Sequence, residues 1–171
     1  IPRWFTPIFS IISLIYTMNQ RNNRKYWGEP TWYLFHGIAA NVESSYYKRN
    51  YNLFFDFIKM ICDNLPCPFC RKHAIDYIKN TNISSIDTKE KLIQYLYDFH
   101  NYVNKRNGTD LYNFKDLDKY EKMNLSRAIE FFNYRFFKTY YNFKTFDKWR
   151  KSKLQKYFIK WINDHKSSFG V

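Results

Sequence analysis

The sequence is poor in cysteine, and this scarcity excludes one class of small protein. Three cysteines in 171 residues are too few, and too unevenly placed, for a secreted domain held together by disulfides. The fold is therefore expected to rest on packing, and any disulfide is expected to be catalytic. Cys62 lies in an apolar helical run and is interpreted as a small buried side chain.

A sustained strand pattern is also missing. No stretch alternates apolar and polar residues with a period of two, whereas several stretches repeat apolar residues at helical spacing. The length is that of one ordinary domain with room for a short appendage. We therefore expect an all-α protein built as a helical bundle.

Motifs that direct charge at nucleic-acid bases are absent as well. The formal net charge of +13 by itself suggests an anionic partner. However, the sequence shows no RNA-recognition, helix-turn-helix or zinc-finger pattern. It is rich in Lys, Asn, Ile, Tyr and Phe together, the residues of A/T-rich codons, so a coding bias can produce much of the charge. No specific nucleic-acid partner is expected.

Two of the three cysteines belong to the most informative motif, PCPFCRKH at residues 66–73. Cys67 stands where a helix N-cap would, Pro68 suits the first helical position, and Cys70 follows in the first turn. The helix N-terminus and the cationic neighbours favour a thiolate, which suits reversible disulfide exchange. On its own the motif also permits half of a zinc site or two unrelated buried thiols.

Helix signals surround this motif. Residues 27–45 contain a helix expected to open at Pro30, on which Trp32 and His36 share one face. That face suits either a hydrogen-bonded structural histidine or a planar ligand. The next helix is expected over about residues 51–64, with an apolar stripe that serves as core.

A further helix is expected after the loop at residues 80–85. Asp87 and Glu90 form a capping-box signal for its start, and Gly108 closes it. Beside its apolar stripe lie three polar residues, more than a core needs: His100, Asn101 and Asn104.

The two ends of the chain differ from its middle. Residues 1–25 include an apolar stretch at 4–18, which is shorter than the roughly 20 residues of a spanning helix. Whether it is an unstructured segment, a packed segment or a membrane anchor stays open. Residues 113–171 are expected to hold two helices, at about 123–140 and 146–164, rich in aromatic and basic side chains. Such aromatic density predicts burial on the bundle, in a dimer contact or on a partner.

Three motifs follow one another in the middle segment: Gly28-x3-Trp32-x3-His36, then Cys67-x2-Cys70, then His100-Asn101-x-Val103-Asn104. In this order they resemble the Erv/ALR family of FAD-linked sulfhydryl oxidases. The form of the cysteine motif is closest to the enzymes of large cytoplasmic DNA viruses. The resemblance covers residues 26–112.

The resemblance implies a four-helix bundle that holds FAD, usually as a homodimer. It also implies that Cys70 is the sulfur next to the flavin and that Cys67 meets the substrate. A substrate thiolate would attack Cys67, and two electrons would pass through Cys70 to the flavin and then to dioxygen, giving hydrogen peroxide. The other residues implied at the cofactor are Gly28, Trp32, His36, His73, His100, Asn101, Val103, Asn104 and Tyr112.

The sequence departs from the family pattern at Glu29, where many members have Arg, and at Thr109, where many have Lys. Phosphate contacts are therefore expected from Lys105 or Arg106. The sequence printed here holds no second cysteine pair that would act as a shuttle. A thiol-bearing protein substrate, with a thioredoxin-like carrier as one candidate, is then expected to reach the active pair directly, unless a segment that precedes residue 1 supplies the shuttle.

One alternative of another class stays open at this point. A zinc-binding structural or interaction module would use Cys67, Cys70, His73 and His100, since a Cys-x2-Cys-x2-His spacing permits such a site.

Under the viral resemblance, the protein is expected in the host cytoplasm or in the virion, with membrane association possible through residues 4–18.

Overall fold

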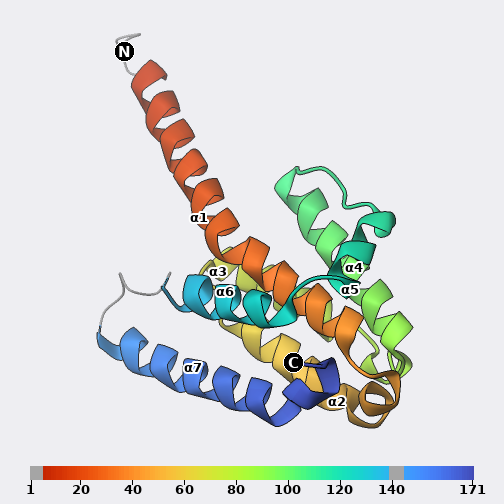
Figure 1. Cartoon of the computed structure of the whole chain (residues 1–171). Helices are drawn as coiled ribbons and strands as arrows, with labels where there is room; N and C mark the ends of the chain where they lie inside the picture. The colour runs from red at the N-terminus through yellow and green to blue at the C-terminus, as the bar shows by residue number, and fades with distance from the viewer. Residues whose placement is uncertain (1–5, 139–144) are drawn as a thin grey trace.

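The fold is known from a computed structural model, which describes the backbone of residues 6–138 and 145–171 and the side chains of residues 24–138 and 149–171. Within these residues every regular element is a helix (Figure 1). The predicted all-α class, a bundle with an appended helical pair, is confirmed.

Four helices form the body of the bundle. They are α1 (Thr6–Asn41), α2 (Ser44–Asp63), α3 (Pro68–Lys79) and α4 (Lys89–Asn107), with a short 3-10 turn, η1 (Ile83–Ser85), before α4. The chain then passes through η2 (Phe114–Leu117) and α5 (Asp118–Glu121). The appended pair consists of α6 (Leu125–Lys138) and α7 (Thr145–His165), followed by η4 (Lys166–Phe169).

Two predicted helix starts are wrong. Pro30 lies inside α1 and does not open it. A proline removes one helical hydrogen bond, but the helix continues because the face that follows, with Leu34 and Phe35, is buried in the core. Helix α2 begins seven residues earlier than expected, at Ser44, because Tyr47 is already fully buried.

The start of α4 differs by one residue from its prediction. Thr88 is the N-cap, and its hydroxyl accepts a hydrogen bond from the Lys91 backbone N–H at 3.4 Å. Asp87 instead pairs with the Lys91 ammonium at 2.7 Å. The end of α4 is as predicted, because Gly108 has a φ of 63° and closes the helix in the left-handed conformation.

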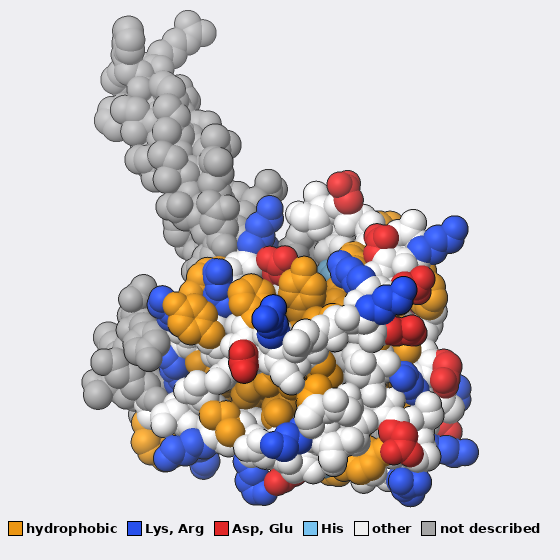
Figure 2. Space-filling model, viewed as in Figure 1, with side chains coloured by type: hydrophobic (Ala, Val, Ile, Leu, Met, Phe, Trp, Pro, Cys, Tyr) orange, Lys and Arg blue, Asp and Glu red, His pale blue; other side chains and the backbone are white. Residues whose placement is uncertain are grey.

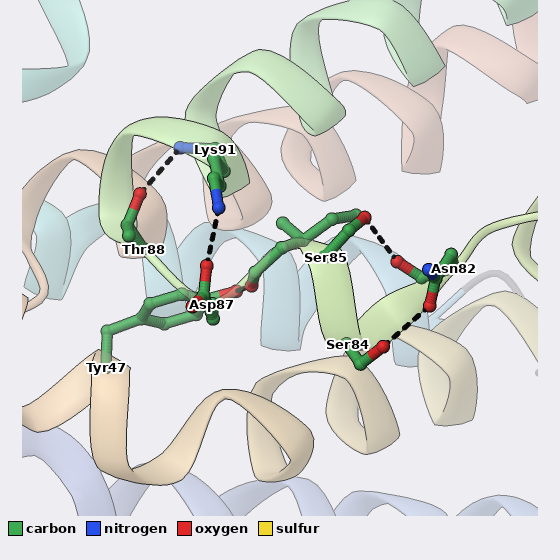
Figure 3. A network of polar contacts seen from close by, with 8 residues as sticks. Tyr47, Asn82, Ser84, Ser85, Asp87, Thr88 and Lys91 are labelled. Carbon is green, nitrogen blue, oxygen red and sulfur yellow. Dashed lines mark hydrogen bonds and ion pairs between the residues drawn. The ribbon is translucent and has the colours of Figure 1, made fainter.

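Polar contacts fasten the loop between α3 and α4 to α2 (Figure 3). The buried Tyr47 hydroxyl donates to the Ile86 carbonyl at 2.8 Å, and burial raises the pKa of that hydroxyl. Asn82 accepts hydrogen bonds from the hydroxyls of Ser84 and Ser85 at 2.7 Å. The start of α4 is thereby held against α2.

The core lies where α1, α2 and α4 meet. The apolar stripe expected on α2 is buried, and so is the first part of the stripe on α4, although Val103 is only half-buried. Cys62 is buried in α2 as predicted. The buried residues of these stripes are Phe54, Phe57, Ile58, Ile61, Leu92, Leu96 and Phe99.

The appended pair is part of this core. Helix α6 runs along α1 (Figure 1) and buries Phe132, Phe136 and Phe137. On α7, the Trp161 ring stacks on Phe57 with ring centroids 3.8 Å apart. Of the three burial sites considered for the aromatic side chains of residues 113–171, the structure shows the first, burial on the bundle.

Acidic and basic side chains alternate on the face of the molecule shown in Figure 2. Figure 2 shows Lys and Arg side chains around one face of the molecule with Asp and Glu side chains between them. No helix within the described residues has the length and apolarity needed to cross a membrane. The side chains of residues 4–18 lie outside the described residues, so membrane association through this stretch stays a prediction.

Candidate active site

Cys67 and Cys70 are joined by a disulfide at the start of α3. Cys67 is the N-cap, and Pro68 is the first helical residue. The Cys67 sulfur accepts a hydrogen bond from the Cys70 backbone N–H, with 3.2 Å between sulfur and nitrogen. The predicted placement of both cysteines is confirmed. The positive end of α3 therefore points at the sulfurs and favours thiolate over thiol when the pair is reduced.

The side chains of Arg71 and His73 connect the start of α3 to its neighbours. The Arg71 backbone N–H donates to the Cys67 carbonyl at 2.9 Å, and its guanidinium donates to the Leu65 carbonyl at 3.2 Å. Its side chain thus folds back over the loop that leads into Cys67. His73, two residues further along, lies 2.9 Å from the Arg106 guanidinium, which ties α3 to the last turn of α4.

A cluster of parallel rings lies between α1 and α4. Trp32 stacks on His100 with ring centroids 4.0 Å apart and an interplanar angle of 10°. His36 Nε2 and His100 Nδ1 lie 3.0 Å apart, and the two side chains are only 2% and 8% exposed. Motif residues from the two helices therefore meet in one cluster.

Two tyrosines beyond α4 extend the cluster. Tyr112 stacks on His100 with centroids 5.0 Å apart, and Tyr120 of α5 stacks on His36 at 4.8 Å. Sequence analysis identified Tyr112 but missed Tyr120. Because Tyr120 lies in a four-residue helix outside the three motifs, no spacing or periodicity indicated it.

Two asparagines of α4 position the segment that carries Tyr112. The Asn101 side chain donates to the Tyr112 carbonyl at 3.1 Å and accepts from its N–H at 2.7 Å. The Asn104 amide donates to the Asp110 carbonyl at 3.1 Å. These asparagines therefore shape the wall of the site through the backbone that follows Gly108.

Basic side chains gather at the end of α4. Lys105 and Arg106 occupy its last turn and are exposed. Arg24 of α1, which sequence analysis missed, donates to the Asn107 side chain at 2.9 Å. Gly28, four residues further along α1, has no atom near the place where a Cβ would stand, so close packing within this chain does not require glycine there.

The two buried histidines are neutral. Burial, followed by the charge of Lys119, lowers the pKa of His100 to about 4. Burial, followed by His100 and then Lys119, lowers the pKa of His36 to about 3. The Lys119 ammonium lies 5.0 Å from the ring centroids of both Tyr112 and Tyr120. A neutral and largely aromatic cluster of mostly buried rings thus lies beside the exposed positive charge of Lys119.

This arrangement does not assemble the zinc ligands considered above. The two cysteines are bonded to each other, His73 contacts Arg106, and His100 contacts His36. Across the part of the chain that the structure describes, no three His, Cys, Asp or Glu side chains form a group that could hold a metal ion.

The neutral histidines predict a loss of stability on mild acidification. In the unfolded chain their pKa is about 6.5, so between pH 6.5 and 4 the unfolded state binds more protons than the folded state. The free energy of unfolding should then be constant above pH 6.5 and fall below it, by up to about 1.4 kcal/mol per pH unit for each histidine. Urea unfolding at a series of pH values measures this.

The matched variant is His100→Gln, which keeps a polar partner for His36 and removes one titrating group. Its free energy of unfolding should depend less steeply on pH over the same window. The carboxylates of Asp76 and Asp87, whose pKa values Lys72 and Lys91 lower, contribute mainly at lower pH, from about pH 5 downward. An unchanged slope in the variant would show that the histidines are not the groups that titrate.

Comparison with known proteins agrees with this site. The model of the Erv1 / Alr family matches residues 29–124, more than half of the chain, and the protein belongs to that family. The match includes the cysteine pair, both histidines and also α5 with Tyr120. It therefore extends twelve residues beyond Tyr112, where the sequence resemblance was expected to end.

The relatives are viral proteins named as FAD-linked sulfhydryl oxidases. One from Invertebrate iridescent virus 6 is 36% identical over 95 residues, which cover 50% of this chain and 82% of the relative. One from African swine fever virus is 25% identical over 107 residues, 62% of this chain and 88% of the relative.

A third relative, from Invertebrate iridescent virus 3, is 31% identical over 83 residues. These cover 48% of this chain, and the chain spans 56% of that relative's length. No solved structure matches the chain.

Proposed function

We propose that the protein is an FAD-dependent thiol oxidase that forms disulfides in protein substrates. One observation carries the proposal. In a member of the Erv1/Alr family, Cys67 and Cys70 form a disulfide at the positive N-terminus of α3, where a reduced thiol is favoured as thiolate.

The exchange steps follow from thiol–disulfide chemistry, with Cys67 taken as the attacked sulfur because the family resemblance implies that role. A substrate thiolate attacks the Cys67 sulfur, the Cys67–Cys70 bond breaks, and Cys70 leaves as a thiolate at the first turn of α3. A second substrate thiolate then attacks the substrate sulfur of the mixed disulfide and releases Cys67. The substrate has gained a disulfide, and the cysteine pair has gained two electrons.

The described residues fit FAD. The flat rings of Trp32, His36, His100 and Tyr112 suit the planar parts of the cofactor, and neutral imidazoles allow them to stack without buried charge. Arg24, Lys105 and Arg106 offer positive charge for its phosphates. Bound FAD would accept the two electrons of the reduced pair and deliver them to dioxygen, with release of hydrogen peroxide.

The purified protein should be yellow and should consume dioxygen when dithiothreitol is added. The measurement combines the absorbance of the flavin band with the rate of hydrogen peroxide production. Elemental analysis of the same sample tests the zinc alternative. A folded protein that binds no FAD on reconstitution would end the proposal, and stoichiometric zinc in its place would favour the alternative.

Finer parts of the proposal rest on the family resemblance. They are a homodimer, a thioredoxin-like carrier as the protein substrate, and the host cytoplasm or the virion as the compartment. The cofactor-binding roles of Gly28, His73, Asn101, Val103 and Asn104 belong to this part of the proposal as well. Sedimentation of the purified protein tests the dimer directly.

A further inference from the structure

Phe69 stands out among the exposed apolar side chains. It is 77% exposed, more than any other large apolar side chain that the structure describes, and it is one of the two residues between Cys67 and Cys70. Single exposed apolar residues are common and by themselves indicate nothing. Phe69 differs from the others because it lies between the two cysteines of the disulfide.

A protein substrate that exchanges with the disulfide comes close to the segment that carries Phe69. The Cα atoms of Cys67 and Cys70 are 5.2 Å apart, and the chain that links them carries the phenylalanine. A mixed disulfide brings a substrate sulfur to about 2 Å from an enzyme sulfur, and the rest of the substrate protein comes with it. A small dithiol has no surface with which to cover the ring.

The surroundings of Phe69 are positively charged. Arg71 and Lys72 follow the disulfide directly, and the guanidinium of Arg106 lies 2.9 Å from the His73 ring of the same helix. The first acidic residue of α3 is Asp76, which already pairs with Lys72 at 2.6 Å. An approaching surface would therefore meet an apolar ring bordered by net positive charge, and acidic side chains would be favoured beside it.

We infer that Phe69 is a specificity-determining docking residue, and that the preferred substrate is a protein whose reduced cysteines are flanked by apolar and acidic side chains. This inference rests on the proposed thiol oxidase function. Burial of the ring would stabilise the encounter complex before exchange, since an exposed aromatic at the centre of a contact is the usual kind of anchor.

The test uses the flavin-loaded enzyme and four synthetic dithiol peptides with one Cys-Gly-Gly-Cys core. Each peptide carries one pair of flanking residues. The four pairs are Leu and Glu, Ser and Glu, Leu and Lys, and Ser and Lys. Wild-type kcat/KM should be highest for the Leu and Glu peptide, about tenfold above the Ser and Glu peptide. Its advantage over the Leu and Lys peptide should shrink as salt is raised.

Phe69→Ser should remove the preference for Leu over Ser, through a higher KM for the Leu peptides, while the rate with dithiothreitol stays unchanged. Phe69→Leu should restore most of the preference. Ile159→Ser, which alters an exposed apolar residue of α7, is the matched control. It should change neither the preference for Leu nor the rate with dithiothreitol. Flavin content and melting temperature of each variant confirm that it is folded.

The possible results separate the inference from the function on which it rests. If wild-type enzyme oxidises neither dithiothreitol nor any peptide, the proposed function fails. If it oxidises all of them and Phe69→Ser keeps the Leu preference, docking by Phe69 is wrong. If Phe69→Ser slows dithiothreitol and every peptide alike, the residue acts on the disulfide itself and the inference is also wrong.

Discussion

Cys67→Ser and Cys70→Ser should each lower the turnover of thiol substrates by about 10³-fold or more, because one sulfur alone cannot cycle between a disulfide and a dithiol. Neither change should prevent FAD binding, since the parallel rings that fit the cofactor lie on α1, α4 and the segment beyond α4. Oxygen consumption with dithiothreitol, together with the flavin content of each variant, measures both effects.

The two variants should differ in their spectra. If Cys70 is the sulfur beside the flavin, Cys67→Ser leaves a free Cys70 thiolate, which should give long-wavelength absorbance, and Cys70→Ser should show none. Cys62→Ala is the matched control. Cys62 is buried in α2, and burial raises the pKa of its thiol, so it is unsuited to exchange and its loss should preserve turnover. Full activity in either active-pair variant would exclude the dithiol mechanism.

Trp161→Ala should destabilise the protein by about 3–5 kcal/mol, as large-to-small changes at buried aromatic residues do. Its ring stacks on Phe57 at 3.8 Å and meets Phe54 edge-on at 5.5 Å, so the change opens a cavity between α7 and α2. Tyr157→Ala on the same helix is the control. Tyr157 is half exposed, so its substitution should lower the free energy of unfolding by about 0.5 kcal/mol or less. Urea unfolding followed by circular dichroism compares the two.

Removing residues 125–171 should have a still larger effect. Without α6 and α7 the apolar faces of α1 and α2 lose their cover, and the truncated chain should aggregate or fail to hold FAD. A truncated protein that stays soluble and yellow, with unchanged activity on dithiothreitol, would show that the appended pair is not needed for the core. Loss of rate on a protein substrate alone would then assign it to docking.

Local signals made the cysteine helix predictable. The order Cys67, Pro68, Cys70 gives both an N-cap and a first turn, and Gly108 supplies the left-handed residue that ends α4. Each of these features depends on a few neighbouring residues. For this reason the sequence was sufficient to place the disulfide, and the three ordered motifs were sufficient to indicate the family.

Long-range packing explains what the sequence did not reveal. The continuity of α1 through Pro30 depends on neighbours from other helices, which no local pattern shows. Tyr120 and Arg24 join the site through contacts with residues about 80 positions away in sequence. Gly37 is similar, because a Cβ there would lie 2.9 Å from the side chains of Met123 and Leu125, and only the folded chain brings these residues to α1.

A hydrogen bond between the turn after α1 and the C-terminal η4 has a consequence for folding during synthesis. The Glu43 backbone N–H donates to the Ser168 carbonyl at 2.8 Å, so the turn between α1 and α2 is closed by η4. Ribosomes add about 5–20 residues per second, so the cysteine pair emerges roughly 5–20 s before the segment that seals this core. During that interval the nascent chain carries its reactive thiols on an unfinished scaffold. Oxidase activity should then appear only after synthesis has passed α7, because contacts of such high sequence separation form last.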